Sequence, residues 1–281
     1  MFGIRKKGKS KETRERKRHS VVQEAYRAGG YEIKIGNAQH QGRRDYQEDS
    51  FGISDTNSEF IQNKGVLAIL ADGMGGLSNG KAVSEHVITS LLAWFRDAGT
   101  VCRFGQDIKN AVTAVNAQIC DIYCRDGNVN SGSTVIATLI KDGVMHWLAV
   151  GDSRIYLKRG ARMYQVNEDH DFLNQLLDDV IASGDSPAEA FSNPQKDSLV
   201  GCIGKPDLDC FDYSKRGLPL CNGDKIVLCS DGVYNALSTD EMNSFLSAEP
   251  MIAAENIKNA VLKKRYPGQD NLTVIIISIN Q

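Results

Sequence analysis

Residues 66–76, VLAILADGMGG, place an acidic side chain at the end of a continuous apolar run. An apolar run of this length is typical of a buried β-strand. The glycines that follow Asp72 allow the backbone to turn sharply, so that the carboxylate can project from the strand end. The stretch therefore predicts a core strand that carries an accessible acidic group at its tip.

Further acidic residues stand beside other apolar runs or in the early segment RDYQED at 44–49. They are Glu48, Asp49, Asp152, Asp231 and Asp270. Carboxylates that converge in one fold repel one another unless a cation neutralises them. Oxygen ligands favour Mg²⁺ or Mn²⁺, and the lack of a His/Cys cluster in the sequence disfavours zinc. The pattern indicates metal-assisted chemistry.

The chain has 281 residues and a formal net charge of −2, which is distributed unevenly. Residues 1–20 hold nine Lys or Arg against two Glu, so the remainder is acidic. An acidic body fits a metal-binding enzyme and argues against a nucleic-acid-binding surface there. No apolar run approaches the roughly 20 residues that span a bilayer. The length suits one large domain or two small ones.

The basic start predicts a flexible tail over residues 1–28, with the folded domain at 29–281. The tail either increases solubility or contacts an acidic partner, a polyanion or a membrane surface, and the sequence leaves these alternatives open. It lacks the apolar core of a secretory signal, so we expect a cytoplasmic protein. Seven cysteines without paired CxxC spacings fit reduced thiols.

Residues 29–281 alternate between helical spacing and apolar runs of strand length. Helical spacing occurs at 81–97, 108–123, 172–181, 239–246 and 251–264. Strand-length runs occur at 31–35, 50–54, 66–70, 134–140, 144–150, 154–158, 224–229 and 273–279. Closely spaced strands between pairs of helices indicate an α+β fold rather than a doubly wound sheet.

The pattern of a phosphate-binding loop, GxxxxGK, overlaps the opening stretch at residues 75–81. The segment follows a strand and opens a helix, as such a loop requires. Ala82, however, stands where a Ser or Thr hydroxyl should bind magnesium. The glycines are better explained by a tight turn beside Asp72.

Read in order, these segments resemble the metal-dependent serine/threonine protein phosphatases of type 2C, from about residue 31 to residue 279. The segments that carry the resemblance are RDYQED at 44–49, ADGMGG at 71–76, SGST at 131–134, GDSR at 151–154, EDH at 168–170, SDG at 230–232 and DNLT at 270–273. Each is weak alone, but their order and spacing match the family. The resemblance implies a four-layer α-β-β-α sandwich with two central antiparallel sheets, and a variable flap at about 171–200.

The resemblance also implies a centre of two Mn²⁺ or Mg²⁺ ions, with a possible third ion. Asp49 and Asp72 would be core ligands, with Asp72 bridging, and the Gly73 carbonyl would bind the second ion. Asp231 and Asp270 would complete the shell of the first ion.

Four further residues have roles that the resemblance implies. Glu48 would hold a water of the metal shell, and Asp152 would bind the third ion together with Asp231. Arg44 would bind the substrate phosphate, and Asn271 would support the site. In this family a water activated by the ions attacks phosphorus, so no cysteine nucleophile is needed.

Two departures from the family pattern affect these expectations. Some relatives carry His where this chain has Met74, and methionine cannot protonate a leaving group. Gly201 stands where relatives carry Arg. The acidic flap residues suggest a preference for basic phosphopeptides; they are Asp178, Asp179, Asp185 and Glu189.

The sequence thus predicts a monomeric phosphatase that acts on phosphoserine and phosphothreonine in proteins and opposes a bacterial Ser/Thr kinase. The alternative is a catalytically weak relative that binds phosphoproteins as a regulatory module.

Overall fold

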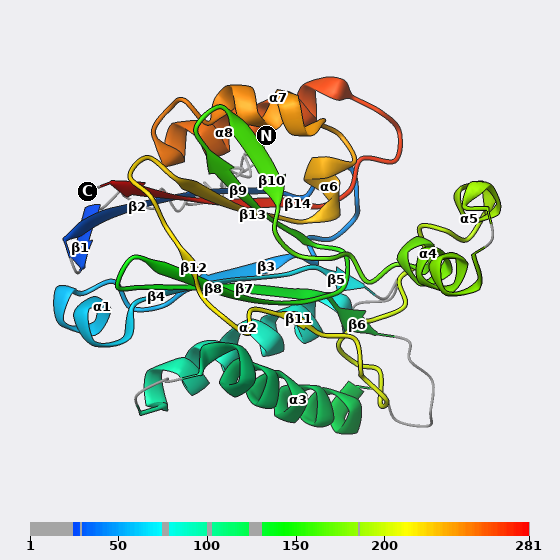
Figure 1. Ribbon diagram of the computed structural model, residues 1–281, viewed down its shortest axis with the longest axis horizontal. Coiled ribbons are helices and arrows are strands. Elements are labelled where there is room, and N and C mark those ends of the chain that lie inside the picture. Colours follow the sequence, from blue (N-terminus) through cyan, green and yellow to red (C-terminus); the bar gives the residue numbers. More distant parts are fainter. Residues whose placement is uncertain are drawn as a thin grey trace, which may run out of the picture.

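The computed structural model describes residues 25–28, 30–74, 79–99, 103–123, 131–184 and 186–280. Two antiparallel β-sheets lie face to face, with helices on both outer sides (Figure 1). The first sheet has the order β1-β2-β14-β13-β9-β10; the second has the order β11-β8-β7-β4-β3, with β12 also paired to β8. This arrangement confirms the expected α+β sandwich of four layers.

The strands of the first sheet are β1 (Ala25–Ala28), β2 (Tyr31–His40), β9 (Arg154–Arg159), β10 (Arg162–Gln165), β13 (Lys225–Cys229) and β14 (Leu272–Asn280). Those of the second are β3 (Ser50–Ile53), β4 (Val66–Ala71), β7 (Val135–Lys141), β8 (Val144–Val150), β11 (Asp212–Tyr213) and β12 (Leu218–Pro219). A small third sheet pairs β5 (Gly73–Met74) with β6 (Gly132–Ser133).

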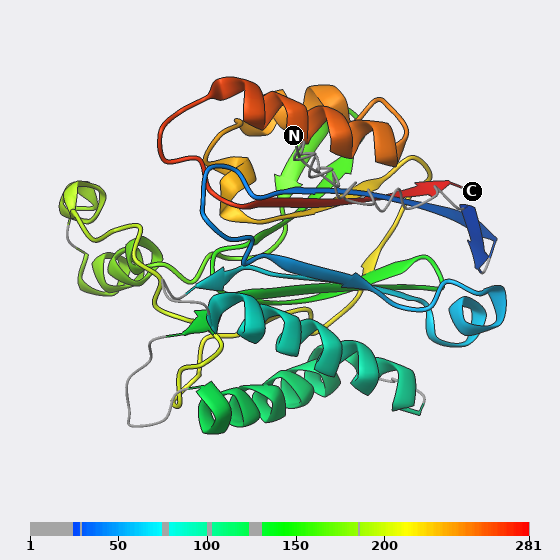
Figure 2. The same ribbon diagram turned by 180° about the vertical axis from the view of Figure 1, so that it is seen from behind.

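The helices are α1 (Ser58–Lys64), α2 (Asn79–Asp97), α3 (Phe104–Tyr123), α4 (Phe172–Ser183), α5 (Ala188–Ser192), α6 (Asp231–Tyr234), α7 (Thr239–Phe245) and α8 (Pro250–Lys264). Helices α2 and α3 cover the second sheet, and α7 and α8 cover the first, as the view from behind also shows (Figure 2). Helices α4 and α5 project from one end of the sandwich (Figure 1).

The two sheets divide the core into three apolar layers. Strand β4 lies between two of these layers, which explains why its sequence is apolar throughout. Leu67 and Ile69 pack in the layer that includes α2 and α3. Ala68 and Leu70 point to the opposite face and pack in the layer between the sheets. Because both faces of β4 are covered, the strand has no solvent face and needs no polar residue.

The ends of the central strands bring the acidic segments to one end of the sandwich. In the second sheet, Ala71 at the end of β4 pairs with Ser50 at the start of β3. In the first sheet, Cys229 at the end of β13 pairs with Val274 and Arg154. Figure 1 shows β5 and α6, which follow β4 and β13, at this same end. The register therefore directs residues next to these strand ends towards a common site.

Strand β1 lies within the range 1–28 that the sequence analysis assigns to the tail. Its residues, Ala25–Ala28, pair antiparallel with β2. Their pairing with β2 depends on backbone hydrogen bonds, which a basic and polar composition does not reveal. The nine basic residues of 1–20 lie outside the described residues.

Short elements were also missed, because they have little periodicity. Helix α1 is seven residues long, and it depends on a local cap in which the Asn57 side chain accepts a hydrogen bond from the Phe60 N–H at 2.8 Å. Helix α6 begins at Asp231 itself. Across the described residues, none of the helices has both the length and the apolar content to cross a membrane.

Leu228→Ala tests the layer between the sheets, where this side chain is fully buried. We expect the free energy of unfolding to fall by about 2–5 kcal/mol, because the truncation leaves a cavity between two packed sheets. Urea unfolding followed by circular dichroism measures the change. Ile252→Ala, at a side chain that is 55% exposed, is the matched control and should cost less than about 1 kcal/mol. Equal losses in the two variants would contradict the core assignment.

Candidate metal centre

Asp49 is the most deeply enclosed acidic residue of the site. It precedes β3 and has no exposed surface. Its Oδ2 accepts hydrogen bonds from the Thr273 hydroxyl at 2.7 Å and the Ser230 hydroxyl at 2.9 Å. Its Oδ1 is buried and has no hydrogen-bond partner among the described residues. Burial raises the pKa of Asp49 to about 6, although the two hydroxyl groups act in the opposite direction.

Asp72 and Asp231 enter the same cluster from the two sheets. Burial raises the pKa of Asp72 well above its usual value, and the nearby carboxylates of Asp49, Asp231 and Asp152 raise it further. Burial also raises the pKa of Asp231 to about 7, with additional contributions from Asp152 and Asp270. These mutual effects show that the structure brings together acidic residues far apart in the sequence.

Asp152 lies at the edge of the cluster, after β8. Burial raises the pKa of Asp152, and the nearby Tyr234 side chain acts in the opposite direction. The Tyr234 ring lies 3.7 Å from the guanidinium carbon of Arg154, which pairs with Asp169 at 2.7 Å. His170 Nδ1 accepts the Gly151 N–H at 3.0 Å, so the EDH segment anchors the turn that carries Asp152.

Arg44 and Asp270 form an ion pair of 2.6 Å at the open side of the cluster. The Arg44 side chain is 60% exposed, and its hydrogen bond to Asp270 raises its pKa. Arg44 therefore lies at the entrance rather than inside the cluster. A guanidinium at this position can bind an anion that approaches the carboxylates.

Asn271 connects the segments that carry these residues. Its Oδ1 accepts the Glu48 N–H at 2.7 Å, and its Nδ2 donates to the carbonyls of Gln41 and Tyr46 at 2.8 and 2.9 Å. Asn271 thus fixes the loop before β3 against the start of β14. These hydrogen bonds hold Gln41, Tyr46 and Glu48 next to Asn271.

Gly73 lies where there is no room for a side chain. A Cβ atom at this position would lie 2.7 Å from the Glu48 carbonyl oxygen. Gly201 is confined in the same way, because an added Cβ would lie 2.7 Å from the Cys210 Cβ and 3.2 Å from the His170 Cβ. A larger residue at position 201, such as the Arg of relatives, would therefore require the backbone to move.

The donor set suits a hard divalent cation. The donors are carboxylate oxygens, one of them buried without a partner, and clustered negative charge is what such a cation neutralises. Across the described residues, no three His, Cys, Asp or Glu side chains stand arranged to hold an ion directly. Asp270 in particular is directed to Arg44. Cation binding at this cluster would therefore require the carboxylates to turn inwards.

Sequence reasoning assigned no role to several residues that form hydrogen bonds with Asp49, among them Ser230, Thr273 and Gln39. Ser230 and Thr273 belong to the recognised segments, so their hydroxyl groups could have been included. Gln39 donates to the Asp49 carbonyl at 3.2 Å and to the Thr273 hydroxyl at 3.0 Å. No pattern in the sequence distinguishes Gln39 from other polar strand residues.

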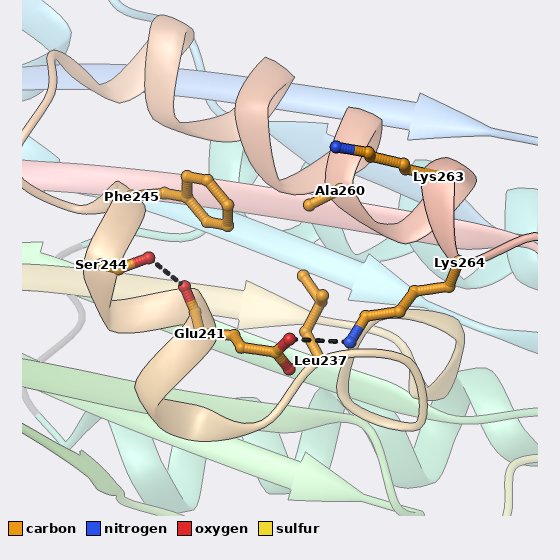
Figure 3. Close-up of a pocket in the computed structure, with 7 residues that line it drawn as sticks. All are labelled: Leu237, Glu241, Ser244, Phe245, Ala260, Lys263 and Lys264. Carbon is orange, nitrogen blue, oxygen red and sulfur yellow. Dashed lines mark hydrogen bonds and ion pairs between the residues drawn. The ribbon is translucent and has the colours of Figure 1, made fainter.

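A separate cavity of about 410 Å³ lies between α7 and α8 in the outer layer (Figure 3). Leu237, Phe245 and Ala260 contribute its apolar surface, and Glu241 pairs with Lys264 at 2.7 Å across it. No acidic residue of the cluster lines this cavity. It is therefore distinct from the candidate metal centre.

Comparisons with known proteins agree with this geometry. Residues 37–264 match the family described as Protein phosphatase 2C. Protein phosphatase PhpP of Streptococcus pneumoniae is 30% identical over 217 residues, which cover 76% of this chain and 86% of that protein.

Solved structures of related phosphatases also superpose well. The serine/threonine phosphatase PstP/Ppp of Mycobacterium tuberculosis is 25% identical, with a TM-score of 0.72, and the match covers 89% of this chain and 99% of that chain. A catalytic domain of PstP solved with two manganese ions is 24% identical, with a TM-score of 0.70, and the match covers 89% of this chain and 100% of that chain.

The raised pKa values predict that the chelator-treated protein loses stability as the pH rises from about 5 to 8. The folded state keeps protons on Asp49, Asp72 and Asp231, whereas unfolded carboxyls with a pKa near 4 are already ionised. Because the folded state binds more protons, the free energy of unfolding falls through this window, by about 2 kcal/mol or more.

The pKa values of His146 and His170 are lowered, so these residues make the free energy of unfolding rise with pH below about pH 6.5. The pH dependence of the wild type must therefore be compared with that of a variant that keeps both histidines. Asp231→Asn serves this purpose, and urea unfolding in EDTA should show a smaller loss of stability in it than in the wild type. Equal pH dependence of the two proteins would show that Asp231 is not protonated in the folded state.

Proposed function

The chain belongs to the protein phosphatase 2C family, and from that premise we propose how its residues carry out the reaction. The protein is a metal-dependent serine/threonine protein phosphatase. The observation that carries the proposed mechanism is the group of carboxylates at one end of the sandwich, in which Asp49 is fully buried and Asp72 and Asp231 are half-buried. Their pKa values rise through burial and through the charge of neighbouring carboxylates. Such a group is stabilised by divalent cations with oxygen ligands, which are Mn²⁺ or Mg²⁺.

Asp49 and Asp72 would hold two cations, with Asp72 between them and the Gly73 carbonyl as a further ligand. Asp231 and Asp270 would complete the first shell of one cation. Glu48 and Asp152 would act farther from these two cations. Glu48 would hold a water of that shell, and Asp152 would join Asp231 in binding a third, weaker ion. When bound, the cations would lower the pKa of a water molecule and so supply the nucleophile that attacks phosphorus.

Arg44 would orient the phosphate monoester. Its planar guanidinium can donate two parallel hydrogen bonds to phosphate oxygens, and its charge offsets the negative charge that the substrate brings. Asp270 holds Arg44 at the entrance through the 2.6 Å ion pair. Asp270 would therefore take part in both phosphate binding and cation binding. It would contact Arg44 and a cation either at the same time or one after the other.

The substrates would be phosphoproteins, and the enzyme would oppose a Ser/Thr kinase. The segment of α4 and α5 carries an excess of acidic residues beside the entrance end, which favours basic phosphopeptides. A cytoplasmic location would agree with phosphoprotein substrates.

Asp72→Asn tests the central ligand. We expect Mn²⁺-dependent hydrolysis of p-nitrophenyl phosphate to fall by roughly three orders of magnitude, because one amide cannot replace a charged ligand shared by two cations. Asp97→Asn, at an exposed residue near the end of α2, is the matched control and should retain full turnover. Substantial activity in Asp72→Asn would refute the ligand assignment and favour a different catalytic group.

Arg44→Met tests the phosphate contact. Loss of charge-assisted hydrogen bonds should lower kcat/KM by about 10- to 100-fold at saturating Mn²⁺. Arg43→Met is the control, because Arg43 is the exposed neighbour and hydrogen bonds to Gln269 through its backbone N–H. If both variants retain wild-type kcat/KM, Arg44 does not bind the substrate phosphate.

A further inference from the structure

Lys81 has no role in the mechanism above, although it closes the GxxxxGK pattern at the start of α2. Its Nζ donates hydrogen bonds to the Asp49 carbonyl at 3.0 Å and to the Ser50 hydroxyl at 3.0 Å. The Lys81 side chain is 37% exposed, so it reaches inwards from the surface. It therefore connects a separate helix to the backbone of the most deeply buried carboxylate.

The contacts around Lys81 extend to the preceding acidic residue. The Ser50 and Ser84 hydroxyls are 2.8 Å apart, and the Ser84 hydroxyl donates to the Glu48 carbonyl at 2.5 Å. Gly80 permits this approach, because a Cβ there would lie 2.5 Å from Glu48 Oε1. The first turns of α2 thus fix residues 48–50 through both Lys81 and Ser84.

The charge of Lys81 contributes less to the site than its hydrogen bonds do. Glu85, one turn along α2, pairs with Lys81 Nζ at 3.3 Å. This pair offsets part of the field that Lys81 would otherwise exert on an incoming cation, and the solvent around both exposed side chains screens the remainder. Removing Lys81 should therefore weaken cation binding through loss of backbone positioning, rather than strengthen it through loss of a positive charge.

We propose that Lys81 is a positioning residue, which fixes the Glu48-Asp49 backbone so that the Asp49 carboxylate is presented to the divalent cation. The inference rests on the metal centre proposed above. Groups that orient metal ligands typically change metal affinity by about 10- to 100-fold when they are removed. Lys81 acts on the ligand through its carbonyl and its neighbour, so the lower end of that range applies.

Lys64 is the last residue of α1 and contacts the other end of α2, so it provides a matched comparison for Lys81. Its Nζ donates to three carbonyls near the end of α2, those of Phe95 at 3.1 Å, Arg96 at 2.6 Å and Ala98 at 2.5 Å. It has the same side chain and the same kind of acceptor as Lys81, but it contacts none of the acidic residues of the cluster. Loss of either lysine should destabilise the fold, and loss of Lys81 alone should affect the cation.

The test is the affinity of the full chain for Mn²⁺, measured by electron paramagnetic resonance of the free ion after removal of metal with a chelator. We expect Lys81→Met to weaken Mn²⁺ binding about tenfold and Lys64→Met to change it less than about twofold. Glu85→Gln keeps Lys81 in place and removes its charge partner, and its Mn²⁺ affinity should stay within about threefold of the wild-type value. Thermal unfolding confirms that each variant is folded.

Equal Mn²⁺ affinity of Lys81→Met and Lys64→Met would overturn the proposal. If the wild type itself binds no Mn²⁺, the proposed metal centre is refuted instead. This result is distinguishable from equal Mn²⁺ affinity in the two lysine variants. If Lys81→Met does not fold, Lys81→Gln takes its place, because its shorter neutral side chain removes the ammonium group that donates to the Asp49 carbonyl and the Ser50 hydroxyl. It should weaken Mn²⁺ binding about three- to tenfold, and unchanged affinity would overturn the proposal.

Discussion

Repulsion among carboxylates at one end of the sandwich is the constraint on which the other features of the site depend. Burial raises the pKa values of Asp49, Asp72 and Asp231, and neighbouring carboxylates raise those of Asp72 and Asp231 further, so the three groups are stable together only as protonated groups or around cations. The protein supplies few compensating charges of its own. Arg44 pairs with Asp270 at the rim, and hydroxyl groups bond one oxygen of Asp49. The same arrangement that costs stability without metal creates an oxygen-lined centre for divalent cations.

The sandwich holds these groups together because each lies next to the end of a strand that is buried in the core. Strand β4 is covered on both faces, and its register with β3 sets Asp72 beside the segment that carries Asp49. Strand β13 brings Asp231 to the same end from the other sheet. Two packed sheets therefore act as a rigid support, and the short turns that follow the strands direct the carboxylates. Outside this support, α2 fixes residues 48–50 and Asn271 fixes the loop before them.

Much of this arrangement could be predicted, because long apolar runs and the order of the motif segments are local properties of the sequence. The helices of α2, α3 and α8 and the central strands were found in that way, and the resemblance gave their layering. The remainder depends on contacts between distant residues. Nothing local shows that Gln39 bonds the Asp49 carbonyl, that Lys81 does the same, or that residues 25–28 pair with β2. The sequence analysis does not interpret the GxxxxGK pattern as a nucleotide-binding loop, and residues 75–78 of the pattern lie outside the described residues. The lysine of the pattern contacts the site through a backbone carbonyl, which no motif describes.

The central claim is that the carboxylates form one centre for two cations with Asp72 between them. Diffraction from crystals of the protein soaked in MnCl₂, recorded at a wavelength where manganese scatters anomalously, tests it most directly. The account predicts two strong anomalous peaks on either side of the Asp72 carboxylate, within about 2.0–2.3 Å of its oxygens. One of them should also contact Asp231, and Asp270 should have turned from Arg44. Anomalous peaks only at surface carboxylates, with none at Asp72, would contradict it.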